Sequence, residues 1–279
     1  MSTKDRKEVF LGTGLQSGGT TLVSWCFLQR SDMDGTLDGD ADLIPLLSCG
    51  KGTSSYYWYK TTISAFSLEE QVALLQDEGC RVRPLLIVRD VRMAWASLMR
   101  KPYGCNGVTA EDPPLRQRFR RFLRSWRHAC EEGIPVLKFE RFLQEPKPEL
   151  QRLCQALELP WQRAMLEWPD PDKEIADGRH GNARFRDSDK SGLAAALDTE
   201  ALNGPVASIH EEDLAWLDET FADFNRALGY PQALDVATLP GRLTPGWEVS
   251  RRFKWRMQQK PLRYVAHKLG LSRYRPLPH

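Results

Sequence analysis

The stretch that decides the fold reads Glu8-Val9-Phe10-Leu11-Gly12-Thr13-Gly14-Leu15-Gln16-Ser17-Gly18-Gly19-Thr20-Thr21. It opens with a short apolar run, which predicts a buried strand, and continues into a glycine-rich turn. Residues 20–29 then alternate apolar and polar side chains at helical spacing. A glycine-rich loop between a strand and a helix is suited to anions, because its N–H groups turn inward and the helix N-terminus adds partial positive charge.

The loop resembles a Walker A motif without matching it. Gly14 and Gly19 have the required spacing, but Thr20 stands where that motif has its lysine. We therefore predict a phosphate loop of a different kind, and the alternative is a tight turn that holds no ligand. The candidate binding residues are Gln16, Ser17, Gly18, Gly19, Thr20 and Thr21.

A second candidate phosphate site follows the strand predicted over residues 83–88. Arg89 would lie at the carboxyl end of this strand, near the ligand crevice of an α/β sheet, and its guanidinium suits a phosphate. Asp90 can cap the next helix, and Ser97 lies two helical turns further on. The alternative is a structural ion pair between Arg89 and Asp90.

Strands alternate with helices along the rest of the chain, which predicts an α/β fold, a parallel β-sheet flanked by helices on both faces. One domain is expected over residues 1–245, because prolines and a glycine interrupt residues 240–245, and a basic tail over 246–279. Further strands are expected at 54–60 and 135–139, and further helices at 68–78, 93–100, 115–131, 149–157 and 211–228.

Taken together, the two sites resemble the PAPS-dependent sulfotransferase family, whose co-substrate is 3′-phosphoadenosine 5′-phosphosulfate (PAPS). Residues 17–21 resemble its phosphosulfate loop, and Arg89-Asp90-Val91-Arg92 with Ser97 resembles its R-D-P-R-x-x-x-x-S motif. The resemblance implies a P-loop-like fold. It also implies that the loop binds the 5′-phosphosulfate, while Arg89 and Ser97 bind the 3′-phosphate.

Three more pieces resemble the family between residues 8 and 230. Residues 59–62 resemble its K-T-H turn, and residues 139–160 resemble Y-E-D-L followed by a leucine-rich helix. Gly181-Asn182-Ala183-Arg184-Phe185 resembles a G-N-P-x-R-F turn, which implies that Arg184 helps to close over the 3′-phosphate.

The chain departs from the family pattern at the positions that handle charge and protons. Ser17 stands where the loop usually has a lysine or arginine, and Thr62 where the turn usually has a histidine. Lys60 is then the candidate cation beside the bridging oxygen, with an exposed strand-end lysine as the alternative. In glycan-type members of the family, a carboxylate some twenty residues past the loop lysine acts as the base, and the same offset here falls between Asp38 and Asp40. The resemblance therefore makes these two aspartates the candidate bases. The alternative is that they belong to a solvated acidic loop.

Composition narrows the functional classes. The six cysteines are scattered singly, without zinc or redox spacing, so we expect no metal cofactor and reduced thiols in the cytoplasm. No apolar run reaches the roughly 18 residues that span a bilayer. The polar start of the chain does not read as a secretory signal.

The tail is strongly basic. Residues 249–279 carry nine basic and no acidic side chains, which leaves −7 on the other 248 residues of a chain whose net charge is +2. An anionic membrane surface or a polyanion is one expected partner, so the protein would be peripheral to the membrane. The alternative is that the tail packs on the acidic body. Nucleic acid is disfavoured, because that body would repel it.

The sequence leaves several functions open. The acceptor could be a glycan, a lipid-linked sugar or a secondary metabolite. The alternatives to sulfuryl transfer are a P-loop kinase-like phosphotransferase and a non-catalytic nucleotide- or glycan-binding member of the same fold. Residues 32–37 also spell a phosphatase D-x-D-G-T pattern, but the apolar strand that this pattern requires before it is missing.

Overall fold

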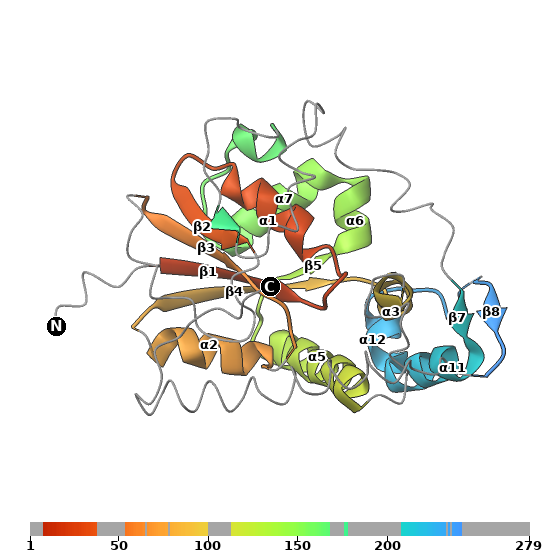
Figure 1. Ribbon diagram of the computed structural model, residues 1–279. Helices are drawn as coiled ribbons and strands as arrows, with labels where there is room; N and C mark the ends of the chain where they lie inside the picture. Colours follow the sequence, from red (N-terminus) through yellow and green to blue (C-terminus); the bar gives the residue numbers. More distant parts are fainter. Residues whose placement is uncertain are drawn as a thin grey trace.

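The computed structural model in Figure 1 describes residues 8–37, 54–64, 66–77, 79–99, 113–167, 176–177, 208–232, 234 and 236–241. The predicted basic tail over 246–279 lies outside these residues, so the predicted division into domain and tail stays a prediction.

A six-stranded sheet forms the centre of the fold. Its strands run in the order β5-β4-β1-β3-β2-β6, and every neighbouring pair is parallel. The α/β prediction is therefore confirmed. The strands are β1 (Glu8–Gly14), β2 (Met33–Leu37), β3 (Tyr56–Lys60), β4 (Arg81–Val88), β5 (Val136–Lys138) and β6 (Ala176–Asp177).

Helices cover both faces of the sheet (Figure 1). One face carries α1 (Thr20–Leu28), α6 (Phe139–Gln144), α7 (Pro146–Ala156) and the 3-10 turn η3 (Arg163–Leu166). The other carries α2 (Leu68–Asp77), α3 (Val91–Met99), α5 (Pro113–Glu131), α11 (Glu211–Thr220) and α12 (Ala222–Ala227). A second, two-stranded parallel sheet pairs β7 (Ile209–His210) with β8 (Thr238–Leu239).

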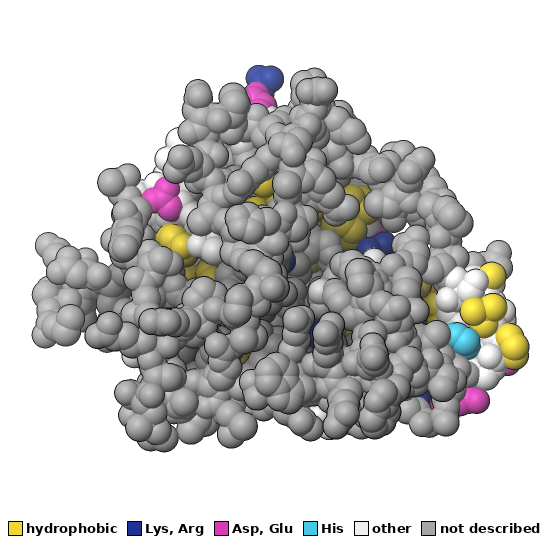
Figure 2. All heavy atoms as spheres, in the orientation of Figure 1, with side chains coloured by type: hydrophobic (Ala, Val, Ile, Leu, Met, Phe, Trp, Pro, Cys, Tyr) yellow, Lys and Arg dark blue, Asp and Glu magenta, His cyan; other side chains and the backbone are white. Residues whose placement is uncertain are grey.

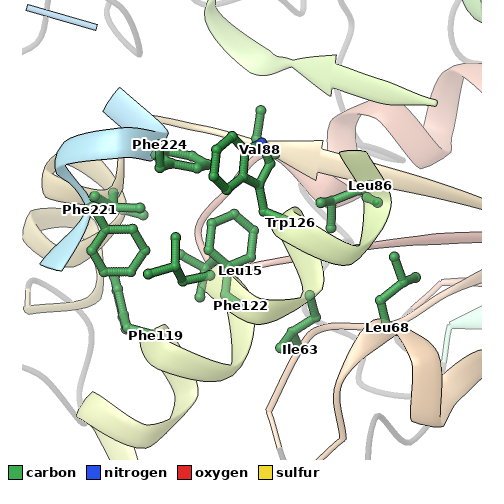
Figure 3. Close-up of a cluster of buried hydrophobic side chains, with 14 of the residues drawn as sticks. Leu15, Ile63, Leu68, Leu86, Val88, Phe119, Phe122, Trp126, Phe221 and Phe224 are labelled. Carbon is green, nitrogen blue, oxygen red and sulfur yellow. The ribbon is translucent and has the colours of Figure 1, made fainter. Parts of the chain in front are cut away.

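The core lies on both faces because successive strand side chains point to opposite sides. In β4, Leu86 and Val88 join one apolar cluster, and Leu85 and Ile87 join the other. Figure 3 shows the first cluster, in which rings from α5 meet rings that follow α11. Both faces are thus apolar, as in sheets covered by helices on each side.

Several elements differ from the sequence-based expectation, and α6, β6, β7 and β8 are among those that were not expected. The single helix expected over 211–228 is broken at Phe221, whose ring is fully buried against Phe119, Trp216 and Phe224 while its backbone leaves helical geometry. The strand β2 was not expected, since its sequence is short, polar and contains a glycine. It is held by parallel pairing with β3.

The strand order fixes where a ligand can bind. The chain moves from β1 to β2 and β3 on one side, and then crosses to β4 on the other side of β1. Such a reversal opens a crevice at the carboxyl ends of the two central strands, the usual ligand site of open α/β sheets. The glycine-rich loop follows β1 and Arg89 follows β4, so both candidate phosphate segments start at this point.

Among the described residues, we find no helix that is both long and apolar enough to cross a bilayer.

Candidate functional site

The loop after β1 begins with a tight turn. The Gly18 N–H donates to the Leu15 carbonyl at 2.9 Å, and Ser17 between them has a φ of 68°, in the left-handed region. A non-glycine residue there costs about 1–2 kcal/mol, and such strain is typical of functional loops. The turn thus gives the loop one defined shape.

Gly19 ends the loop and starts α1 as its N-cap. Its φ is 85°, and a β-carbon on it would overlap the ring of Phe139. Glycine is therefore required here both by conformation and by space. Phe139 in turn closes one side of the loop.

This loop contains two kinds of hydrogen-bond donor. The first-turn N–H groups of α1 have no partner within the helix, as in any helix. The Ser17 hydroxyl is buried and finds no hydrogen-bond partner among the described residues, which is uncommon for a buried polar atom. A bound oxyanion would satisfy both sets of donors.

Arg89 joins the second segment to the loop. Its Nη1 atom donates to the carbonyl oxygen of Ser17 at 3.1 Å, and its guanidinium lies 5.4 Å from the ring centroid of Phe139. The neighbouring strands explain the contact, because Gly14 pairs with Ile87, two residues before Arg89. The two segments predicted to bind phosphates are therefore in direct contact.

Asp90 has a structural role. Its Oδ1 accepts from the Arg92 N–H at 3.0 Å and so caps α3, as expected. Its other oxygen pairs with the Arg92 guanidinium at 2.7 Å, and both side chains are buried. The alternative that Arg89 and Asp90 form an ion pair is therefore wrong, since Arg92 takes that place.

Glu140 holds the segment after β4 from the opposite side. Its two oxygens accept from the Asp90 N–H at 3.0 Å and from the Tyr230 hydroxyl at 2.9 Å. Burial first, and then the Glu140 carboxylate, raise the pKa of Tyr230 well above its usual value. Both Glu140 oxygens thus already accept hydrogen bonds, so this carboxylate is a positioning group rather than a candidate base.

Lys60 lies at the end of β3, opposite Gly12 of β1, and is only 3% exposed. The alternative of an exposed strand-end lysine is therefore wrong. The following residues continue alongside β1, with the Thr61 N–H on the Gly12 carbonyl at 3.0 Å and the Ile63 N–H on the Gly14 carbonyl at 2.8 Å. Lys60 is thus held beside the strand that leads into the phosphate loop.

Two arginines of α5 reach the same region, and sequence reasoning missed them. Arg118 is buried, and its Nη1 donates to the Gln16 Oε1 at 2.8 Å. Arg121 donates to the carbonyl oxygen of Ser64. The signal that could have indicated them is a run of six arginines and no acidic residue over 113–130.

Other predicted site residues stay predictions. Asp38, Asp40 and Arg184 lie outside the described residues. Ser97 lies in α3 and is half-buried, and the structure does not test its binding role. Within the described part of the chain, no group of three or more His, Cys, Asp or Glu side chains could hold a metal ion.

Comparisons of the sequence with known proteins return no relative. No protein-family model matches the chain, and no curated protein matches it.

Solved structures do resemble the fold, at low identity. Mouse sulfotransferase SULT7A1 complexed with PAP is 11% identical, with 79% of this chain and 84% of that chain covered and a TM-score of 0.46. The sulfotransferase domain of the Synechococcus PCC 7002 olefin synthase is 12% identical, with 79% and 98% covered and a TM-score of 0.49. A sulfotransferase from Alicyclobacillus acidocaldarius is 13% identical, with 80% and 96% covered and a TM-score of 0.44.

Proposed function

We propose that this chain transfers a sulfuryl group from PAPS to an acceptor hydroxyl. The observation that carries the proposal is the contact of Arg89 with the Ser17 carbonyl at the crevice between β1 and β4. It brings a loop suited to a 5′-phosphosulfate next to an arginine suited to a 3′-phosphate. A nucleotide with phosphates at both ends of its ribose fits such a pair of sites.

The proposed reaction is an in-line displacement at sulfur. The acceptor oxygen forms a bond to sulfur while the bond from sulfur to the bridging phosphate oxygen breaks. The acceptor proton passes to a base, and the electron pair of the broken bond stays on 3′-phosphoadenosine 5′-phosphate (PAP). Positioning and charge stabilisation supply most of the catalysis, as in phosphoryl transfer.

The residues take separate roles in this scheme. The loop N–H groups and the Thr20 and Thr21 hydroxyls bind the 5′ end, while Arg89 and Ser97 bind the 3′-phosphate. Lys60 is the proposed cation beside the bridging oxygen, and its burial strengthens its field there. Asp38 and Asp40 remain the proposed bases, and Arg184 the residue that closes over the 3′-phosphate.

Two rival functions predict different ligands. A P-loop kinase would bind ATP with Mg²⁺, but Thr20 occupies the position of its lysine. A non-catalytic member would bind nucleotide or glycan without turnover. Calorimetry with PAP and with ATP separates the first rival from our proposal, and transfer of radiolabelled sulfate from PAPS separates the second.

The decisive experiment pairs binding with turnover. Purified protein should bind PAP in preference to ATP. When it is incubated with PAPS and fractionated extracts, one acceptor should gain the mass of a sulfate in mass spectra. Preferential ATP binding would contradict the proposal, whereas PAP binding without any turnover would point to the non-catalytic rival.

The basic tail carries a separate proposal, that it meets an anionic membrane surface. Aromatic residues interleave its basic side chains, and aromatic rings favour the membrane interface. The full-length protein should pellet with anionic vesicles at low salt, and a protein ending at Pro245 should not. If both stay in the supernatant, the tail instead packs on the acidic body or binds a polyanionic acceptor.

A further inference from the structure

Helix α5 presents two different faces to the rest of the molecule. Phe119, Phe122 and Trp126 pack into the core (Figure 3). Arg118 and Arg121 lie one turn apart on a neighbouring stripe, since residues three apart share a helix surface. Each of them contacts a loop that follows a central strand.

Arg118 contacts the phosphate loop itself. Only 4% of its surface is exposed, and its Nη1 lies 2.8 Å from the side-chain oxygen of Gln16, inside the tight turn. The amide oxygen is neutral, whereas a guanidinium pairs most strongly with an anionic oxygen. The contact therefore holds a buried cation against the phosphate loop.

Arg121 lies beside the segment that follows Lys60. It donates to the Ser64 carbonyl, one residue after the Ile63 N–H contacts the Gly14 carbonyl. Burial lowers the pKa of Arg121, while the charge of Glu70 acts to raise it and the charge of Arg124 to lower it. A further anion at this half-buried guanidinium would offset more of the cost of burying its charge.

Basic side chains are visible near the middle of the face in Figure 2, among atoms of residues that are not described. The described residues combine Arg118 at the loop turn with Arg121 beside the adjoining segment. The loop itself has Ser17 where the sulfotransferase pattern has a cation.

We propose that Arg118 and Arg121 of α5 together supply the positive charge that the loop lacks, and that they bind the oxygens of the 5′-phosphosulfate. On ligand binding, an oxygen of the anion takes the place of the Gln16 side-chain oxygen at Nη1 of Arg118. The identity of the anion rests on the proposed function, while the class of ligand, an oxyanion at the loop, does not.

The test uses the full-length protein and two probes. PAP probes the whole nucleotide site, and inorganic pyrophosphate probes the loop and the two arginines without the adenosine. Arg118→Gln and Arg121→Gln should each lower the binding affinity for both probes by about ten- to a hundredfold, because each removes a charge-assisted contact. Arg118→Lys should restore part of the affinity for both.

The matched control is Arg127→Gln, which removes the same charge from the exposed side of the same helix. It should leave both affinities unchanged. Thermal unfolding of each variant shows whether it is folded. If Arg118→Gln unfolds, the less buried Arg121→Gln and the conservative Arg118→Lys still decide the outcome. Added guanidinium ion should speed single-turnover transfer by a folded Arg118→Gly variant, which a purely structural role would not produce.

The outcomes separate this inference from the proposed function. If the wild type binds PAP and both glutamine variants bind PAP and pyrophosphate as tightly, the inference is overturned and the function stands. If the wild type binds pyrophosphate but not PAP, and the variants no longer bind pyrophosphate, the inference stands and the proposed function is overturned. If the wild type binds neither probe, both are overturned.

Discussion

The guanidinium of Arg89 donates a hydrogen bond to the backbone carbonyl of Ser17, with 3.1 Å between Nη1 and the oxygen. The contact joins residues 72 positions apart, and it is possible because β1 and β4 are neighbours in a parallel sheet. Arg89 therefore contacts the loop, whereas Asp90 forms its ion pair with Arg92.

The first prediction concerns the 3′-phosphate. Arg89→Ala should weaken PAP binding by about ten- to a hundredfold, because a charge-assisted contact contributes about 1.5–3 kcal/mol. Binding of adenosine 5′-monophosphate, which lacks the 3′-phosphate, should change little. Calorimetry with both nucleotides measures the difference. Arg81→Ala, at the exposed other end of the same strand, is the control. Equal losses for the two nucleotides would place Arg89 elsewhere than at the 3′-phosphate.

The second prediction concerns Lys60. Lys60→Met keeps most of the buried stem and removes the charge, so it should slow single-turnover transfer by about a hundredfold or more at saturating PAPS. PAP affinity should fall much less, because the charge acts mainly on the phosphate as it departs. Lys147→Met, at an exposed position of α7, serves as the control. A variant that reacts at the normal rate would show that Lys60 is only a packing residue.

How far the sequence predicts this site depends on how local each signal is. Arg89 and Lys60 could be placed because Arg89 follows, and Lys60 ends, a strand whose apolar residues are contiguous, so each marks the carboxyl end of a strand in the sheet. Arg118 could not be placed. Helical spacing puts it off the core face, but its partner Gln16 is 102 residues away, and only the tertiary fold brings the two together.

The fold shows the same limit. Strand β4 is evident from its apolar run, whereas β2 has the sequence Met-Asp-Gly-Thr-Leu and is stabilised by its neighbour. Its Thr36 Oγ1 lies 2.5 Å from the Tyr57 hydroxyl of β3. Likewise, no glycine or proline marks the break at Phe221. The break depends on how the buried Phe221 ring packs in the core, and the order of residue types along the chain does not predict that packing.

The third prediction concerns the buried ion pair of Arg92 with Asp90. Arg92→Met should lower the free energy of unfolding by about 3–5 kcal/mol, because it leaves a buried carboxylate without its cation. It would also release Asp218 of α11 and the Pro231 carbonyl, which Arg92 contacts at 3.2 and 2.9 Å. Urea denaturation measures the loss. The exposed Arg226→Met, which breaks a surface pair with Asp223, should lose no more than about 1 kcal/mol. Similar losses would mean that burial does not matter here.

The last prediction separates backbone strain from steric overlap at the phosphate loop. Gly19 and Gly133 both have a positive φ, 85° and 66°. A β-carbon on Gly19 would overlap the Phe139 ring, whereas one on Gly133 would meet nothing within 4 Å. Gly133→Ala should therefore lower the free energy of unfolding by only about 1–2 kcal/mol, the cost of a positive φ for a residue with a β-carbon.

Gly19→Ala should lower the free energy of unfolding by that amount and by about 1–3 kcal/mol more, because the Phe139 ring must move away from the loop. Since the ring of Phe139 lies against both Gly19 and Arg89, its movement should also disturb the anion site. PAP affinity should fall for Gly19→Ala and stay unchanged for Gly133→Ala. Denaturation and calorimetry on the two variants measure both effects. If the two alanines lose the same stability and neither loses PAP affinity, then the loop tolerates a side chain at Gly19, and the close packing of Phe139 does not shape the site.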